Sequence, residues 1–296
     1  TDVGSAPLTL VHCGVCDLIQ LDHTVREQEL YENYWYLSRL NQKIVDNLSS
    51  IVDDITIEVG LSQDDIVLDI GANDGTLLSN YDSKKFVRVG CDPAKNIHLD
   101  LVKHTDIMIG DFFNYENWVA QVGLKPARAI TTVAMFYDLD DPNSFVQDIK
   151  KVLATDGVWL CQLMTAEPML SSNDLGNVIH EHIEYYSFKS LVALMERHGL
   201  EIYKVLENDI NGGSYQLYIR HYTTGSIEYA EDITPARITQ WADNIAQNRD
   251  DTVAFLRKVV NEGKRVYIMG ASTKGNTIMQ YYGLDSELIA GAAEIH

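Results

Sequence analysis

The stretch that decides the fold is Val67-Leu68-Asp69-Ile70-Gly71-Ala72-Asn73-Asp74-Gly75-Thr76. It predicts a strand ending at Asp69, a tight turn, and a helix whose first backbone N–H groups face a ligand. Gly71 lets the chain turn without a side chain, and Gly75 allows close packing at the start of the helix. Asn73 stands where the dinucleotide fingerprint requires its second glycine, so NAD is disfavoured.

Two more signals follow this loop in sequence order. Asp92 comes after a predicted strand at Val87–Cys91, where a carboxylate can accept hydrogen bonds from both ribose hydroxyls. Asp111 and Phe112 come after the next predicted strand, where an acid can meet an adenine amino group and a ring can stack on the base. The alternative is that the glycines only shape a doubly wound sheet. The predicted cofactor-binding residues are Asp69, Gly71, Asn73, Gly75, Asp92, Asp111 and Phe112.

From Asp65 onward, short β-branched runs alternate with helical segments, which is typical of a parallel sheet covered by helices. Strands are predicted at 66–69, 87–91, 107–109, 129–133, 158–163, 201–206 and 215–220. We therefore predict an α/β fold with a doubly wound, seven-stranded sheet.

A second unit is predicted after a long helix at 235–262. Residues 265–269 read as a strand, and Gly270-Ala271-Ser272-Thr273-Lys274-Gly275 reads as a turn into a helix, as in a second Rossmann-like unit. The predicted domains are an N-terminal appendage at 1–50, a cofactor-binding domain at 51–225, and a linker with the start of the second unit at 226–296.

Charge and composition exclude several classes of partner. The chain has 43 acidic and 23 basic side chains, a formal net charge of -20 that repels the phosphates of nucleic acid and anionic lipid. It has neither a membrane-length apolar run nor a secretory leader pattern, so we expect a cytoplasmic protein that acts on a small molecule. It begins with Thr1 and stops at His296 without an obvious finishing element, so we expect both ends to be incomplete.

With residues 69–75, Asp92 and 110–113 in place, the chain resembles the class I S-adenosylmethionine (SAM) methyltransferases. Three further motifs resemble those of the bacterial sugar C-methyltransferases, which act on nucleotide-linked keto-deoxysugars. They are His180-Glu181-His182-Ile183-Glu184-Tyr185-Tyr186-Ser187, Asn211-Gly212-Gly213-Ser214 and Gly270-Ala271-Ser272-Thr273-Lys274-Gly275-Asn276. The resemblance implies SAM as cofactor, a small N-terminal zinc domain, and a substrate cleft between the SAM domain and a second Rossmann-like domain.

Methylation of a carbon next to a carbonyl requires a base for the α proton, and histidine suits that role because its pKa lies near neutrality. The resemblance places the base at His182 and an assisting carboxylate at Glu181, with His180 in the same motif. Ile179 replaces a tyrosine that precedes the motif in the family, which leaves open whether carbon or oxygen is methylated. The motif read alone also fits a polar loop; a zincin-type metal site would need a histidine in place of Glu184.

Three residues are predicted to contact the substrate. Tyr137 follows the fourth strand, Asn211 lies in a glycine turn that brings the backbone close, and Lys274 can hold a diphosphate at a helix start. Each also has a purely structural interpretation, as a packing or turn residue.

Cys13 and Cys16 have the spacing of two zinc ligands, and the resemblance identifies them as the second half of a four-cysteine site. The first pair is absent, and His23 is a conceivable third ligand. Cys91 and Cys161 fall in predicted strands and are expected to be core residues.

Together these features predict a SAM-dependent C-methyltransferase that acts on a nucleotide-linked sugar, with zinc as a structural metal. The alternatives are an O- or N-methyltransferase of a small metabolite and a non-catalytic SAM-binding module. The sequence does not determine the oligomeric state.

Overall fold

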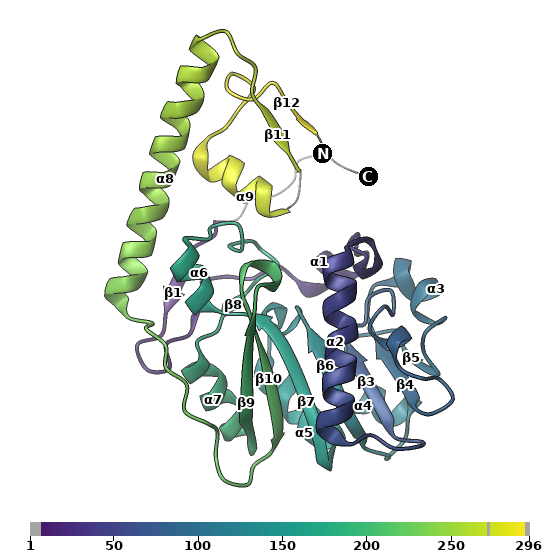
Figure 1. The fold of residues 1–296 in the computed structure, drawn as a ribbon. Coiled ribbons are helices and arrows are strands. Elements are labelled where there is room, and N and C mark those ends of the chain that lie inside the picture. Colours follow the sequence, from purple (N-terminus) through teal and green to yellow (C-terminus); the bar gives the residue numbers. More distant parts are fainter. Residues whose placement is uncertain (1–6, 271–272, 294–296) are drawn as a thin grey trace.

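Seven strands form one mixed sheet at the centre of the computed structural model, which describes residues 7–270 and 273–293 (Figure 1). Their order across the sheet is β5-β4-β3-β6-β7-β10-β9. Only β10 runs antiparallel to its neighbours, β7 and β9. The strands are β3 (Ile66–Ile70), β4 (Val87–Cys91), β5 (Ile107–Ile109), β6 (Ala127–Val133), β7 (Leu153–Met164), β9 (Leu200–Asn208) and β10 (Ser214–His221). The predicted doubly wound, seven-stranded sheet is confirmed, and each predicted strand overlaps an observed one.

Helices cover both faces of this sheet, which explains why its central strands are continuous apolar runs. All five residues of β3 are buried. On one face, α2 (Gln42–Val59) contributes Ile51 and Ile55 to a core with Leu160 of β7. On the other face, Phe136 and Trp159 pack with residues of three helices. These helices are α4 (Tyr115–Gln121), α5 (Pro142–Val152) and α7 (Phe188–Arg197).

Local sequence sets where these helices begin and end. The side chain of Asn41 accepts a hydrogen bond from Lys43 N–H at the start of α2, and Gly60 ends that helix in the left-handed conformation. Asp141 caps α5, whose first residue is Pro142. Ser187 caps α7 through reciprocal bonds with Ser190.

The structure differs from the prediction directly after the cofactor loop. In place of a full helix the chain forms only a 3-10 turn, η2 (Leu78–Asn80). The other short helical elements are α1 (Glu27–Tyr31), η1 (Ser38–Leu40), η3 (Lys95–Ile97), α3 (His98–Leu101), η4 (Phe136–Asp138), α6 (Ala166–Ser172) and η5 (Ile210–Gly212).

A second, three-stranded sheet joins the N-terminal segment to the histidine motif. It consists of β1 (Leu10–His12), β2 (Ile19–Leu21) and β8 (Glu184–Tyr185), all antiparallel. Gln20 pairs with Glu184, so residues from the start of the chain lie next to the motif that contains His182.

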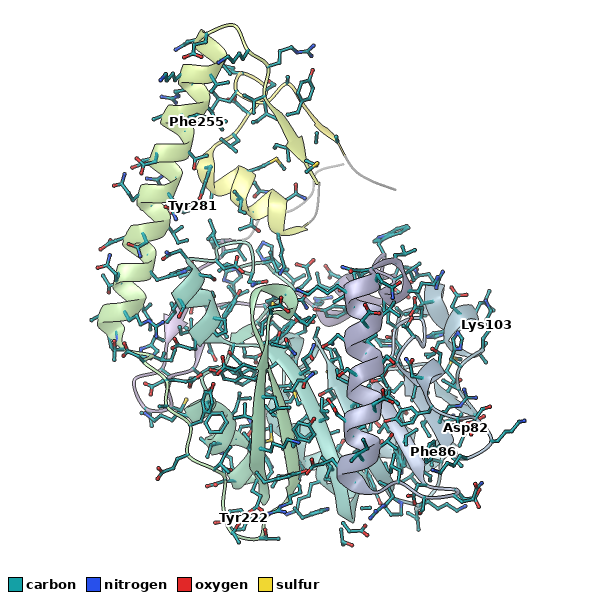
Figure 2. The ribbon with its side chains drawn as sticks, viewed as in Figure 1. Asp82, Phe86, Lys103, Tyr222, Phe255 and Tyr281 are labelled. Atoms are coloured by element: carbon teal, nitrogen blue, oxygen red, sulfur yellow. The ribbon has the colours of Figure 1, made fainter. Side chains whose placement is uncertain are left out.

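The C-terminal part contains the long helix α8 (Pro235–Asn261), then β11 (Tyr267–Met269), α9 (Thr273–Tyr282) and β12 (Gly291–Ala293). The strands β11 and β12 pair in parallel, and α9 lies between them in the sequence, as in a Rossmann-type βαβ unit (Figure 1). The guanidinium of Arg249 in α8 lies 5.4 Å from the ring centroid of Tyr281 in α9. Figure 2 labels Tyr281 on α9 and Phe255 on α8. Ala271 and Ser272 of the predicted turn, like residues 294–296, lie outside the described residues. No helix in the described ranges is long and apolar enough to cross a membrane.

Candidate active site

The strand order reverses between β3 and β6, and in such sheets ligands bind in the crevice at the carboxyl ends of the strands around this point. The cofactor loop leaves β3 at this crevice. Gly71 has a φ of +71°, and a Cβ there would approach Met135 Cγ to 3.0 Å. The loop therefore needs glycine at this position for both backbone conformation and space.

The backbone N–H groups of this loop are largely committed to the protein itself. Those of Gly71 and Ala72 donate to the carbonyl oxygen of Cys91, and that of Gly75 donates to Ala72. The N–H of Asn73 donates to Asp92 Oδ2 at 2.8 Å. The expectation that these groups face a ligand is wrong, because parallel pairing with β4 and the Asp92 carboxylate already use them.

Asp92 follows β4 and accepts hydrogen bonds from the cofactor loop and from the turn after β4. It is 7% exposed, and its two oxygens accept bonds from Asn73 N–H and Ala94 N–H. Burial raises the pKa of Asp92, opposed by these two hydrogen bonds. Each carboxylate oxygen has a further lone pair, so the donor chemistry fits ribose hydroxyls, as expected for a SAM site. His98, which the sequence interpretation missed, donates from Nε2 to the backbone carbonyl oxygen of Asp92 at 2.9 Å. Its ring lies 3.0 Å from where a Cβ on Gly110 would be.

The other predicted cofactor residues are spread around this crevice. Asp69 is buried within the sheet, where Thr131 Oγ1 donates to it at 2.7 Å, and burial raises its pKa to about 7. Asp111 is exposed after β5, and its Oδ1 accepts the N–H of Phe112. Gly75 has a φ of +79° beside His104.

An N-terminal segment, residues 36–39, crosses the cofactor loop and was not predicted to do so. The amide of Asn73 donates to Tyr36 O at 2.9 Å and accepts from Ser38 N–H at 3.0 Å. Asp74 accepts from both the backbone and the guanidinium of Arg39. Only the unusual density of aromatic residues at 31–36 marked this segment in the sequence.

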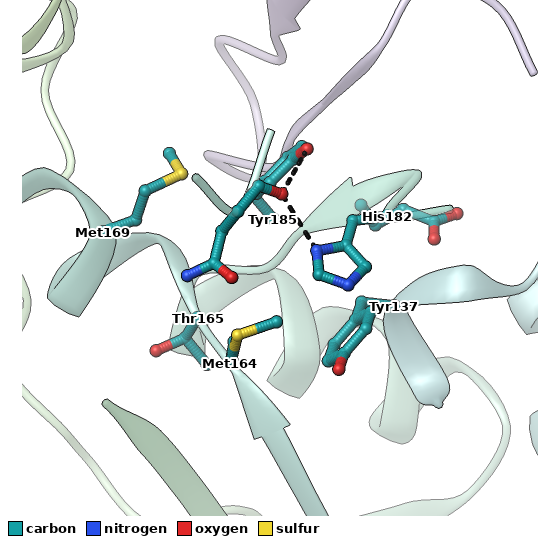
Figure 3. A pocket seen from close by; sticks show the side chains of 8 residues that line it. Tyr137, Met164, Thr165, Met169, His182 and Tyr185 are labelled. Carbon is teal, nitrogen blue, oxygen red and sulfur yellow. Dashed lines mark hydrogen bonds between the residues drawn. The ribbon is translucent and has the colours of Figure 1, made fainter. Parts of the chain in front are cut away.

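A small cavity of about 10 Å³ lies beside the histidine motif (Figure 3). His182 and Tyr137 form one side, with ring centroids 4.5 Å apart and planes at 64°. Figure 3 shows the two rings side by side, with Met164, Met169, Thr165 and Tyr185 around them. The lining residues are Tyr137, Met164, Thr165, Met169, Asn177, His182, Glu184 and Tyr185.

The hydrogen bonding of His182 assigns its tautomer. Its Nδ1 lies 2.9 Å from the carbonyl oxygen of Asn177, which can only accept. Nδ1 therefore carries the proton, and Nε2 is the free base. Burial lowers the pKa of His182 to about 4, opposed by the bond to Asn177 and reinforced by the charge of Lys274. The imidazole is neutral at physiological pH.

The structure separates the three residues of the predicted catalytic motif. His180 is half-buried and lies beside His23, with ring centroids 6.4 Å apart. The backbone oxygen of Glu181 accepts from Tyr31 Oη at 3.2 Å. Neither His180 nor Glu181 lines the cavity of His182.

Asn177 connects this cavity to the glycine turn. Its amide lies 3.5 Å from the carbonyl oxygen of Asn211, which adopts a left-handed φ of 56°. A groove of about 370 Å³ adjoins this turn and runs between the first unit and α9. Its lining residues are Ser172, Asn173, Asp174, Leu175, Gly176, Gly212, Ile278 and Tyr282.

Lys274 extends from α9 toward the same region. Its Nζ lies 3.9 Å from Met164 Sδ, and Met164 lines the cavity of His182. Burial lowers the pKa of Lys274, and Asp174 opposes this effect. The structure thus brings Tyr137, Asn211 and Lys274 to the surroundings of one base.

Cys13 and Cys16 lie in the turn between β1 and β2, where Cys13 N–H donates to Leu18 O at 2.8 Å. Backbone hydrogen bonds from Cys16 and Val15 lower the pKa of the Cys13 thiol, and burial raises that of Cys16. Among the residues described, no three His, Cys, Asp or Glu side chains gather as metal ligands. Two thiols do not complete a tetrahedral zinc site, so the predicted zinc centre is not supported.

A sheet with one reversed strand, a glycine loop after its first strand and an acid after its second define a class I methyltransferase. Residues 36–205, more than half of the chain, match the family model described as a methyltransferase domain, and the chain belongs to that family. It is a SAM-dependent methyltransferase. Residues 209–295 match the model described as a C-methyltransferase C-terminal domain, which supports transfer to carbon.

A curated relative, the C-methyltransferase NovU of Streptomyces niveus, is 27% identical over 96% of this chain and 70% of its own. Partly similar solved structures include a methyltransferase bound to the activator Trm112 from Haloferax volcanii. Its TM-score is 0.47 at 14% identity, covering 61% of this chain and 93% of that chain. A SAM-dependent methyltransferase from Clostridium acetobutylicum has a TM-score of 0.47 at 11% identity. The match covers 60% of this chain and 92% of that chain.

Proposed function

We propose that this enzyme methylates a carbon next to the carbonyl group of a nucleotide-linked keto-deoxysugar, with His182 as the general base. The observation that carries the proposal is the neutral imidazole of His182 in the cavity shared with Tyr137. Its Nδ1 is bound to the carbonyl oxygen of Asn177, and its Nε2 has no hydrogen-bond partner among the described residues. A base held in one tautomer beside a methyltransferase crevice suits removal of an acidic α proton.

His182 Nε2 takes the α proton, and the electrons of that C–H bond form the C=C bond of an enolate while the carbonyl π electrons move to oxygen. Bound SAM supplies an electrophilic methyl group on a sulfonium. With SAM held by residues at the carboxyl ends of β3, β4 and β5, this methyl group would pass to the enolate carbon, the electrons of the methyl–sulfur bond would stay on sulfur, and the carbonyl would be restored. His182 then releases its proton to solvent.

The cofactor is placed by residues at the carboxyl ends of β3, β4 and β5. We assign the ribose hydroxyls to Asp92 and the adenine to Asp111 and Phe112. Asp69, Gly71, Asn73 and Gly75 shape the loop that holds the methionine part, since their own contacts are within the protein.

The substrate is placed by the cavity and the groove together. Tyr137 packs against the sugar, and Asn211 and Lys274 flank the entrance from the groove, where the Lys274 ammonium suits a diphosphate. A groove of about 370 Å³ is within the size range of small-molecule sites. Glu181 and His180 position the turn around the base through Tyr31 and His23.

The test is isotope exchange with SAM present and absent. With a nucleotide-linked keto-deoxysugar in deuterium oxide, the enzyme is expected to wash deuterium into the α carbon, and His182→Gln is expected to lower exchange and methylation at least 100-fold. His198→Gln is the matched control, since His198 bonds Asn143 at the end of α7 and does not line the cavity. Methylated product without exchange would point to an oxygen or nitrogen acceptor. Retained binding of S-adenosylhomocysteine without turnover on any acceptor would identify a non-catalytic module.

A further inference from the structure

Glu184 is a buried carboxyl group that nothing in the site so far explains. It is 6% exposed, it lines the cavity of His182, and its Oε2 has no hydrogen-bond partner among the described residues. An ionised carboxylate in such surroundings would lose its hydration without compensation. The group is therefore kept for a reason other than stability.

Acidic and aromatic side chains surround Glu184. Asp140 and Asp138 come from η4 and the residues after it, and Tyr186 follows in its own segment; each interacts electrostatically with the Glu184 carboxyl. Tyr137 and His182 face the same cavity, and Gln20 lies opposite on β2. Within the described ranges no Lys, Arg or His forms an ion pair with Glu184. Burial, with a contribution from Asp140, raises the pKa of Glu184 to about 9.

The cavity has other unsatisfied polar atoms. Thr165 Oγ1 and Asn177 Oδ1 also have no partner among the described residues, and both residues line the cavity. Its volume of about 10 Å³ corresponds to one water-sized group. A single ligand oxygen that can accept a hydrogen bond fits a cavity that contains one protonated carboxyl and one neutral imidazole.

We propose that Glu184 is a neutral carboxylic acid that donates a hydrogen bond to the carbonyl oxygen of the substrate, opposite the base His182. As His182 Nε2 removes the α proton, negative charge develops on that oxygen, and a donor fixed in a dry site stabilises it more than water does. Glu184 keeps its proton throughout, so no additional proton transfer enters the reaction. This role rests on the proposed function, because it requires an enolate.

The first experiment compares Glu184→Gln with Glu184→Ala in the full chain. The amide of Gln still donates a hydrogen bond, so Glu184→Gln should keep methylation within about tenfold, whereas Glu184→Ala should lose about 100-fold or more, the typical cost of removing one oxyanion donor. Binding of S-adenosylhomocysteine should be unchanged in both. Equal loss in both variants would show that an ionised carboxylate is needed, and full activity of Glu184→Ala would remove any role in the reaction; either result overturns the proposal.

The pH profile gives a second readout. Methylation by the wild type should decline as pH rises through about 9, because Glu184 then loses its proton, and Glu184→Gln should lack this decline. Asp140→Asn removes the neighbouring charge, lowers the pKa of Glu184, and should shift the decline to lower pH without affecting Glu184→Gln. An identical decline in wild type and Glu184→Gln would contradict the proposal.

A third measurement does not depend on substrate. The folded protein holds the Glu184 proton up to about pH 9, whereas the unfolded chain releases it near the ordinary value of 4.5. The stability contribution of this group is thus full below 4.5 and declines as pH rises toward 9. Urea unfolding should show that wild type loses stability relative to Glu184→Gln across this window. If the difference in stability between wild type and Glu184→Gln does not change with pH, Glu184 is not protonated in the folded protein and the proposal is wrong. If the difference changes between pH 4.5 and 9 as expected but no deuterium is exchanged, only the proposed reaction is rejected.

Discussion

Asn73 holds the cofactor loop from two sides, and this explains why a residue other than glycine occupies that position. Its backbone N–H binds Asp92, while its side-chain amide binds the segment of residues 36–39. Its φ of 50° lies in the left-handed region, which asparagine tolerates better than most residues. A glycine, which the dinucleotide fingerprint has at this position, has no side chain and could not link residues 36–39 to the cofactor loop.

Asp92→Ala should weaken binding of S-adenosylhomocysteine by about 1.5–3 kcal/mol, the range for hydrogen bonds to a charged group. The variant loses the partner of Asn73 N–H and Ala94 N–H, and with it the acceptor that we propose for the ribose hydroxyls. Calorimetric titration measures this, with Asp209→Asn as control because Asp209 is an exposed acid paired with Lys43. Unchanged affinity for Asp92→Ala, or tighter binding of NAD, would contradict the assigned cofactor site.

At the scale of elements, the turn between β9 and β10 connects the sheet to the cavity of His182. Gly213 has a φ of +119°, and a Cβ there would lie 2.5 Å from Pro168 Cβ in α6. The neighbouring Asn211 carbonyl accepts from Asn177, whose own carbonyl holds His182. The glycine pair therefore lets η5 lie close to α6 and keeps the residues around the base in place.

Gly213→Ala should lower the free energy of unfolding by about 2–4 kcal/mol, because it combines backbone strain with a clash against a rigid ring. Urea unfolding measures the change. Gly14→Ala is the matched control, since a Cβ at Gly14 meets nothing within 4 Å. If both variants unfold at the same urea concentration as wild type, the close approach to Pro168 is not a constraint on the fold.

For the whole molecule, α8 determines where the C-terminal unit lies. Only Trp241 and Ile245 of this helix are buried, and they pack with Met169 and Val178 from the surroundings of the cavity. The guanidinium of Arg237 also binds the carboxylate of Glu167 in α6. Through these contacts α8, which leads to α9 and Lys274, is anchored beside α6.

Trp241→Ala should cost about 3 kcal/mol of stability, as expected for truncation of a buried aromatic residue, and should raise KM for the sugar substrate. Binding of S-adenosylhomocysteine should remain, because Trp241 packs with Met169 and Val178 in a cluster that includes no residue of the cofactor loop. Steady-state kinetics and calorimetry separate the two effects. Phe255→Ala on the same helix is the control, since Phe255 is 63% exposed (Figure 2). Equal KM values in both variants would contradict the role of α8.

The sequence by itself determined the sheet and the class of enzyme. Buried parallel strands are continuous apolar runs, and Gly71 and Gly75 occupy the turn positions with positive φ. Residues 66–76 and the later strands could therefore be recognised from the local sequence. The same local reasoning wrongly predicted a helix after Thr76, where only η2 forms, and open N–H groups in a loop that pairs them internally.

Tertiary structure alone decided which polar residues meet at the site. His182 and His180 are two residues apart, yet one enters the cavity with Tyr137 and the other lies beside His23. The pKa of Glu184 is raised by burial and by Asp140, which the sequence pattern does not show to be its neighbour. Arg39 reaches Asp74 because residues 36–39 fold back over the loop. The hydrogen bonds, the pKa and the position of each of these side chains depend on residues that are distant in the chain. A local sequence pattern does not show which residues those are.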